Sequence, residues 1–86
     1  MVAMVPPIHA SYDPTDQIVF RLRLGDGIRR ERLAYGMSSS ELARRIGASR
    51  ALVYRWEAGR NMPSAFYLER VALALRTPVE TLLRDD

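Results

Sequence analysis

Residues 38–59 read SSSELARRIGASRALVYRWEAG, and this stretch decides the fold of the chain. It holds two short helix signatures, opened by Ser38 and by Ser49. Serine is a preferred N-cap because its hydroxyl accepts a hydrogen bond from a free amide of the first turn. Gly47 stands between the signatures and Gly59 follows the second, and glycine commonly ends helices. We therefore expect two short helices joined by a tight turn.

The two expected helices cover residues 39–46 and 50–58, and they differ in charge. Glu41 stands three residues after Ser38, as in a capping box. The second helix carries arginines on the face that its apolar residues leave free. A compact helix–turn–helix with a basic second helix has a shape and charge that fit the major groove of DNA.

Three further helices are expected around this pair, and no strand is expected within residues 24–84. Glycine, proline and serine punctuate the remaining helical patterns, so the predicted class is an all-α, five-helix domain. The added helices run from Leu24 or Asp26 to Tyr35, over residues 64–76, and from the Thr77-Pro78 cap to about Leu83.

The N-terminal extension, residues 1–23, is the least regular part of the chain. Its first 14 residues contain three prolines and no periodicity, so we expect a flexible tail there. Apolar residues and arginines alternate over residues 17–24, which favours a half-exposed strand or an extended arm. A cap at Asp16 could instead open a helix, but Gly25 and Gly27 argue against its continuation.

Composition narrows the class of protein. The 86 residues suffice for one small domain, and 48% of them are hydrophobic. The absence of cysteine excludes disulfides and thiol-ligated zinc. No apolar run approaches the roughly 18 residues of a membrane span, and the N-terminus lacks the basic leader of a signal peptide. We expect a soluble cytoplasmic protein, associated with the nucleoid, that needs no cofactor and contacts no membrane.

Catalysis is not expected from this sequence. His9 is the only histidine and falls in the expected tail. The serines at 38–40 have no histidine nearby in sequence, and helix capping accounts for them better than nucleophilic chemistry.

The positive charge is concentrated on the helical pair. Residues 29–60 hold eight arginines against three acids, whereas the whole chain has a net charge of +3 and no lysine. A GC-rich genome would explain the choice of arginine through codon usage. Bidentate recognition of guanine and phosphate would explain it as well, and the two explanations are compatible.

From about Leu24 to Leu83, the chain resembles the Cro and phage-repressor type of helix-turn-helix, the xenobiotic-response-element (XRE) family. The resemblance implies a lambda-repressor-like fold and double-stranded DNA as the partner. It is carried by Ile28, Arg32, Gly36-Met37-Ser38, Glu41-Leu42-Ala43, Ile46-Gly47-Ala48-Ser49, Val53, Trp56-Glu57-Ala58-Gly59, Pro63-Ser64, Leu68, Ala72, Leu75, Val79 and Leu82.

Matching the family position by position assigns roles on the helical pair. Arg50, Ala51 and Arg55 occupy positions that commonly meet base edges, and Tyr54 shares their outward face. The alternative is that the two arginines contact only phosphate or solvent. Contacts with the sugar-phosphate backbone of DNA are expected from Ser49, Arg60, Asn61 and Arg44.

Ser39 departs from the family, which usually has glutamine at this position for a phosphate contact. A serine hydroxyl and the helix amides can still receive a phosphate, with shorter reach.

Other residues of the pattern are expected to be structural or solvated. By resemblance, Arg32 pairs with Glu57 and ties the first helix to the third. Ala48, Val53 and Trp56 are expected to face the core, and Arg29, Arg30 and Arg45 to lie on the solvated surface.

The expected function is sequence-specific DNA binding by a small bacterial or phage transcriptional regulator, a repressor rather than an activator. One such domain reads few base pairs, so we expect a homodimer on a palindromic operator. Dimer contacts could come from Val79, Leu82 and Leu83 or from residues 17–24; alternatively, Arg21 and Arg23 could enter the minor groove as an arm. The rival hypotheses are an antitoxin that binds a toxin partner and an interaction module that has lost DNA binding.

Overall fold

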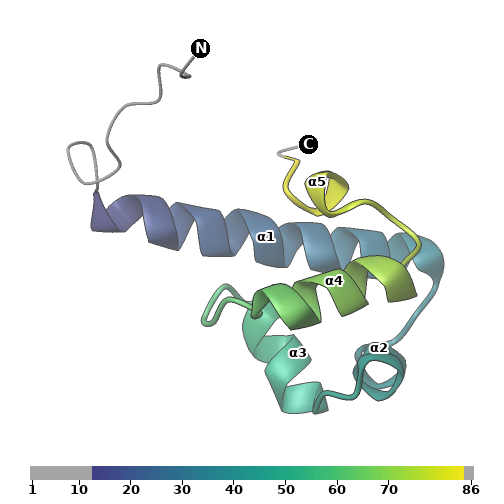
Figure 1. The fold of residues 1–86 in the computed structure, drawn as a ribbon. Coiled ribbons are helices and arrows are strands. Elements are labelled where there is room, and N and C mark those ends of the chain that lie inside the picture. The colour runs from purple at the N-terminus through teal and green to yellow at the C-terminus, as the bar shows by residue number, and fades with distance from the viewer. Residues whose placement is uncertain (1–12, 85–86) are drawn as a thin grey trace.

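The computed structural model describes residues 13–84, which form five α-helices (Figure 1). A long first helix extends along the molecule, with α2 and α3 on one side, α5 on the other and α4 alongside (Figure 1). The five-helix, all-α prediction is confirmed. The helices are α1 (Pro14–Tyr35), α2 (Ser39–Ile46), α3 (Arg50–Glu57), α4 (Ala65–Ala74) and α5 (Val79–Leu82).

The serine caps form as predicted. Ser38 Oγ accepts from the amide of Glu41 at 3.1 Å, and Ser49 Oγ accepts from the amide of Leu52 at 3.1 Å. These bonds satisfy amides that an α-helix leaves free at its start, so both helices begin where their serines stand. The fifth helix differs from the prediction, because its N-cap is Pro78 and no side chain caps it.

The prediction of a strand or arm over residues 17–24 was wrong, because α1 begins at Pro14 and not at Leu24 or Asp26. Asp13 is its N-cap and accepts from the amide of Thr15 at 3.0 Å, and proline fills the first helical position. The alternation of apolar residues and arginines is therefore carried by a helix. Residues 1–12, where most of the expected tail and His9 fall, lie outside the described residues.

Gly25 and Gly27 lie inside α1. Both positions need glycine because the backbone of a neighbouring segment comes too close for a side chain. A Cβ on Gly25 would stand 2.8 Å from the carbonyl oxygen of Glu57, and one on Gly27 would stand 2.6 Å from the carbonyl carbon of Leu82. Glycine costs a helix roughly 1 kcal/mol relative to alanine. The close packing of α1 against the end of α3 and against α5 offsets that cost.

One hydrophobic core joins all five helices. Trp56 is only 2% exposed and Val53 is fully buried, so both face inward as predicted, with Ala48 partly buried against them. Within residues 13–84, no helix is both long enough and apolar enough to cross a bilayer. The buried apolar residues are Leu24, Ile28, Met37, Leu42, Ala43, Ile46, Val53, Trp56, Val71, Ala72, Leu75 and Leu82.

Candidate nucleic-acid interface

A three-residue turn sets α3 against α2. Gly47 has a φ of 75°, which an L side chain rarely adopts, and its amide donates to the carbonyl of Ala43. The amide of Ala48 donates to the same carbonyl at 2.9 Å. The chain thus leaves α2 at once and enters α3 at Ser49, which gives the two helices a fixed mutual orientation.

The outward face of α3 carries the side chains that the sequence assigned to it. Arg50, Ala51, Tyr54 and Arg55 are all exposed, and Tyr54 is 60% exposed. On the opposite face, Val53 and Trp56 are in the core. The helix therefore presents an exposed surface with two guanidinium groups and one phenol.

Ser39, at the start of α2, lies next to this surface. Together with Arg50, Ala51 and Tyr54 it lines an open hollow of about 620 Å³. Arg50 Nη1 is 3.4 Å from Ser40 Oγ, a long contact that restrains the guanidinium only weakly. The α2 N-terminus and the outward face of α3 thus share one surface.

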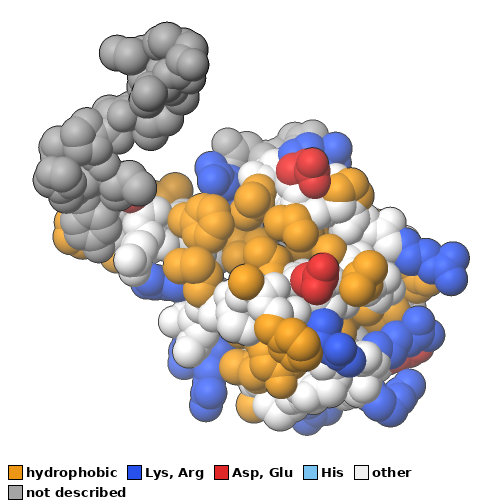
Figure 2. Space-filling view, viewed as in Figure 1, with side chains coloured by type: hydrophobic (Ala, Val, Ile, Leu, Met, Phe, Trp, Pro, Cys, Tyr) orange, Lys and Arg blue, Asp and Glu red, His pale blue; other side chains and the backbone are white. Residues whose placement is uncertain are grey.

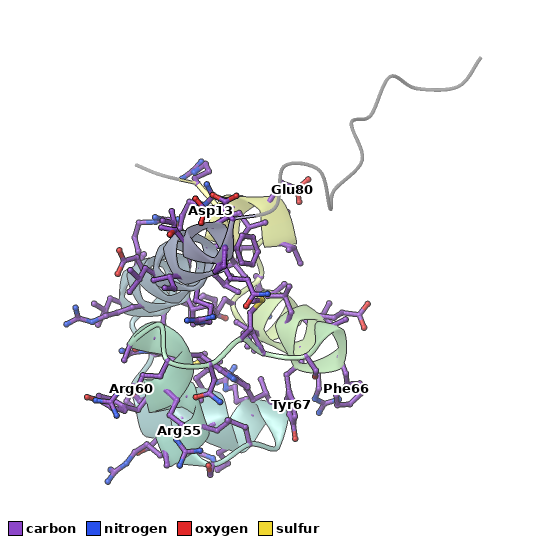
Figure 3. All side chains as sticks on the ribbon, turned by 90° about the vertical axis from the view of Figure 1, so that its left-hand side faces the viewer. Asp13, Arg55, Arg60, Phe66, Tyr67 and Glu80 are labelled. Carbon is purple, nitrogen blue, oxygen red and sulfur yellow. The ribbon has the colours of Figure 1, made fainter. Side chains whose placement is uncertain are left out.

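The remaining predicted contact residues are exposed at the ends of the helical pair. Arg44 is on α2, Ser49 caps α3, and Arg60 and Asn61 follow the turn that ends α3. Figure 3 places Arg55 and Arg60 on the same side of the molecule, with Asp13 and Glu80 near its opposite end. The arginine side chains at α3 are therefore well separated from the acidic groups at the start of α1 and on α5.

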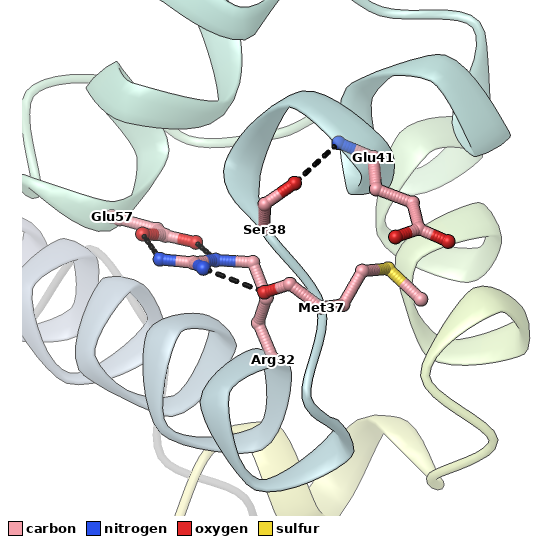
Figure 4. Close-up of polar contacts among 5 residues, drawn as sticks. All are labelled: Arg32, Met37, Ser38, Glu41 and Glu57. Atoms are coloured by element: carbon pink, nitrogen blue, oxygen red, sulfur yellow. Dashed lines mark hydrogen bonds and ion pairs between the residues drawn. The ribbon is translucent and has the colours of Figure 1, made fainter.

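Arg32 and Glu57 join α1 to the last residue of α3, as the resemblance implied (Figure 4). Arg32 Nε donates to Glu57 Oε2 at 2.7 Å and Nη2 donates to Oε1 at 2.9 Å. Nη1 donates to the carbonyl oxygen of Met37 at 2.8 Å. The hydrogen bonds to Glu57 raise the pKa of Arg32 above its ordinary value, although burial opposes the shift. This bidentate pair fixes the end of α3 on the core.

A family model described as helix-turn-helix matches residues 28–82. The chain belongs to the helix-turn-helix family. It is 37% identical over 62 residues to an uncharacterized transcriptional regulator in the ATPase CF(0) region of Rhodospirillum rubrum. This match covers 72% of the chain and 57% of the relative.

Solved structures share the helix-turn-helix fold. The clp gene regulator ClgR from Corynebacterium glutamicum is similar with a TM-score of 0.72 and 31% identity, over 74% of this chain and 68% of that chain. The restriction-modification controller protein C.AhdI from Aeromonas hydrophila is similar with a TM-score of 0.69 and 29% identity, over 72% of this chain and 94% of that chain.

Some arginines of this helix-turn-helix chain make contacts that were not predicted. Arg30 was expected in solvent, but its Nη2 donates to the carbonyl of Thr81 at 2.8 Å and so joins α1 to α5. Arg45 is exposed as expected and pairs with Glu41 at 2.9 Å. Arg29 is exposed.

Arg21 is also placed differently from the minor-groove arm considered above. It lies on α1, and its Nε donates to the carbonyl of Gly59 at 3.2 Å. The Asp13-Pro14 start signal could have revealed the helix, whereas nothing in the sequence indicated the contact with Gly59.

Proposed function

We propose that this chain binds double-stranded DNA sequence-specifically, with α3 in the major groove, and acts as a cytoplasmic, nucleoid-associated transcriptional regulator. The observation that carries the proposal is the exposed face of α3, which holds two arginines above a fully packed inner face. A recognition helix in the major groove needs that division. Two of the similar proteins are named as a transcriptional regulator and a gene regulator, which supports the same function.

Arg50 and Arg55 are the proposed base readers. A guanidinium donates two parallel hydrogen bonds to O6 and N7 of guanine, and a good bidentate contact contributes about 1–3 kcal/mol of discrimination. Ala51 lies between them on the exposed face, where its methyl group suits a thymine methyl. Tyr54 offers a phenol to the same groove.

The proposed phosphate contacts surround this surface. Ser39 and the α2 amides would receive one phosphate, and the Ser49 hydroxyl another. Arg44, Arg60 and Asn61 would contact the backbone further out. These contacts orient α3 and contribute affinity without reading sequence.

A homodimer on a palindromic operator is the proposed assembly, with half-sites about 34 Å apart. Leu82 is fully buried in the core and therefore cannot supply a dimer contact. Ile18, Val19 and Leu22 on α1 are each about half exposed, at 49%, 53% and 49%. Apolar side chains gather over α1, α4 and α5 on the face seen in Figure 2, which favours this side for self-association.

Charged substitution on α1 tests the assembly. Ile18→Glu combined with Val19→Glu is expected to convert the dimer to a monomer in sedimentation velocity. An unchanged dimer would rule out this face.

Selection from random duplexes, followed by footprinting, tests the DNA-binding proposal. We expect enrichment of one palindromic sequence with two protected half-sites. In the proposed repressor role, the protein bound at this operator would block transcription. Failure to enrich any sequence would contradict sequence-specific binding.

A further inference from the structure

The first half of α1 crosses the end of the proposed recognition helix. Gly25 packs directly against the backbone of Trp56 and Glu57, the last two residues of α3. The family model matches from residue 28, so Gly25 lies just before the matched region.

The contact continues onto the turn that follows α3. Gly59 has a φ of 75°, and a Cβ there would stand 2.6 Å from Leu22 Cδ2 and 3.3 Å from Leu22 Cα. Arg21 Nε donates to the carbonyl of the same glycine at 3.2 Å. Gly59, two residues after the end of α3, is therefore held by a hydrogen bond and by close packing, both from one turn of α1.

Gly59 determines where the next two residues go. The amide of Arg60 donates to the carbonyl of Arg55 at 2.9 Å and that of Gly59 donates to Trp56 at 3.1 Å, as in a Schellman motif. Arg60 and Asn61 are both exposed. Figure 3 shows Arg60 on the same side of the molecule as Arg55. A shift of Gly59 would move both side chains relative to the face of α3.

We propose that Arg21 is a positioning residue, which holds Gly59 so that Arg60 and Asn61 meet the DNA backbone in register with the base-reading face of α3. This inference rests on the proposed DNA-binding function. Arg21 acts through Gly59 and not by contacting DNA, because its Nε is directed to the Gly59 carbonyl. The first half of α1 thus supports the binding surface from behind.

The test uses the full chain and the duplex selected by the wild-type protein. Arg21→Ala is expected to weaken binding about tenfold, a loss in the range for a hydrogen bond from a charged donor. Arg29→Ala is the matched control, since it removes the same charge from an exposed position of the same helix. The control is expected to bind within about twofold of the wild type because long-range charge effects are screened.

A double-mutant cycle separates positioning from direct contact. The cycle treats Arg60→Ala/Asn61→Ala as one change. If Arg21 acts by positioning these two residues, adding Arg21→Ala to that variant weakens binding no further. Losses that multiply would show that Arg21 contacts DNA independently and would overturn the proposal.

Hydrogen exchange supplies a readout without DNA. In Arg21→Ala, the Arg60 amide is expected to exchange faster relative to core amides such as those of Val53 and Val71, and in Arg29→Ala it is expected to be unchanged. Equal exchange and equal binding in Arg21→Ala and wild type would overturn this inference alone. A wild-type protein that retains no duplex would instead count against the proposed function.

Discussion

Arg32, in the last turn of α1, and Glu57, the last residue of α3, form a bidentate ion pair whose side chains are only 8% and 9% exposed. Breaking such a pair leaves one buried charge without its partner. Arg32→Met is therefore expected to lower the free energy of unfolding by about 3–5 kcal/mol, as measured by urea denaturation.

Two further variants serve as controls for this prediction. Arg45→Ala removes an exposed pair with Glu41, which is expected to contribute at most about 1 kcal/mol. The double variant Arg32→Met/Glu57→Leu leaves no unpaired charge and is expected to recover much of the loss. A small effect of Arg32→Met alone would show that the pair does not hold α3 to the core.

Substitution of Gly27 is expected to destabilise the fold, although this glycine lies within a helix. Alanine in place of a helical glycine ordinarily stabilises a protein by about 1 kcal/mol. Here the added Cβ would meet the backbone of Leu82, so Gly27→Ala is expected to lower the melting temperature and displace α5. An unchanged or raised melting temperature would contradict the close packing of α1 on α5.

Arg76 occupies a position that favours glycine. Its φ is 53°, and the amides of Arg76 and Thr77 donate to the carbonyls of Leu73 and Ala72, as in a Schellman motif. Arg76→Gly is expected to stabilise the fold by about 0.5–1 kcal/mol, because the left-handed conformation strains any L side chain. Arg76→Ala keeps that strain and serves as the control in the same thermal unfolding experiment.

Alanine substitutions of Arg50 and Arg60 are expected to weaken DNA binding in different ways. Arg60→Ala removes a proposed phosphate contact, so we expect binding to weaken on every duplex and the slope of log affinity against log salt to fall by about 0.9. Arg50→Ala removes a proposed base contact, so we expect sequence preference to be lost at one base pair of each proposed half-site. Titrations of selected and scrambled duplexes at several salt concentrations separate the two, and identical behaviour would contradict the assigned roles.

The sequence predicted α2, α3 and the fold class because their signals are local. Ser38, Ser49 and Gly47 act on amides and dihedral angles within one turn of themselves. The start of α1 was missed because the alternation over residues 17–24 favours a strand, whereas the Asp13-Pro14 cap that opens the helix lies before it. Gly25 and Gly27 were misinterpreted as signs that the helix could not continue. Glycine is needed at these positions because backbone segments more than 30 residues away in the chain pack against them.

In the candidate site, too, features set by local signals were predicted and features set by long-range packing were not. The outward position of Arg50, Ala51, Tyr54 and Arg55 was predicted from the apolar pattern of the helix together with the family resemblance, and their exposure confirms it. The contact of Arg21 with Gly59 spans 38 residues and depends on how α1 crosses α3, which no local pattern encodes. The burial of Leu82 was likewise a matter of tertiary packing.

Substitution of guanine N7 tests the central claim most directly, namely that Arg50 and Arg55 of α3 read guanine in the major groove. In the selected duplex, 7-deazaguanine at the contacted position of each half-site removes one acceptor and leaves base pairing intact. The account predicts about tenfold weaker binding by the wild type. It also predicts no further loss in the variant whose arginine faces that base. Wild-type binding that is unchanged by 7-deazaguanine at every guanine of the site would contradict it.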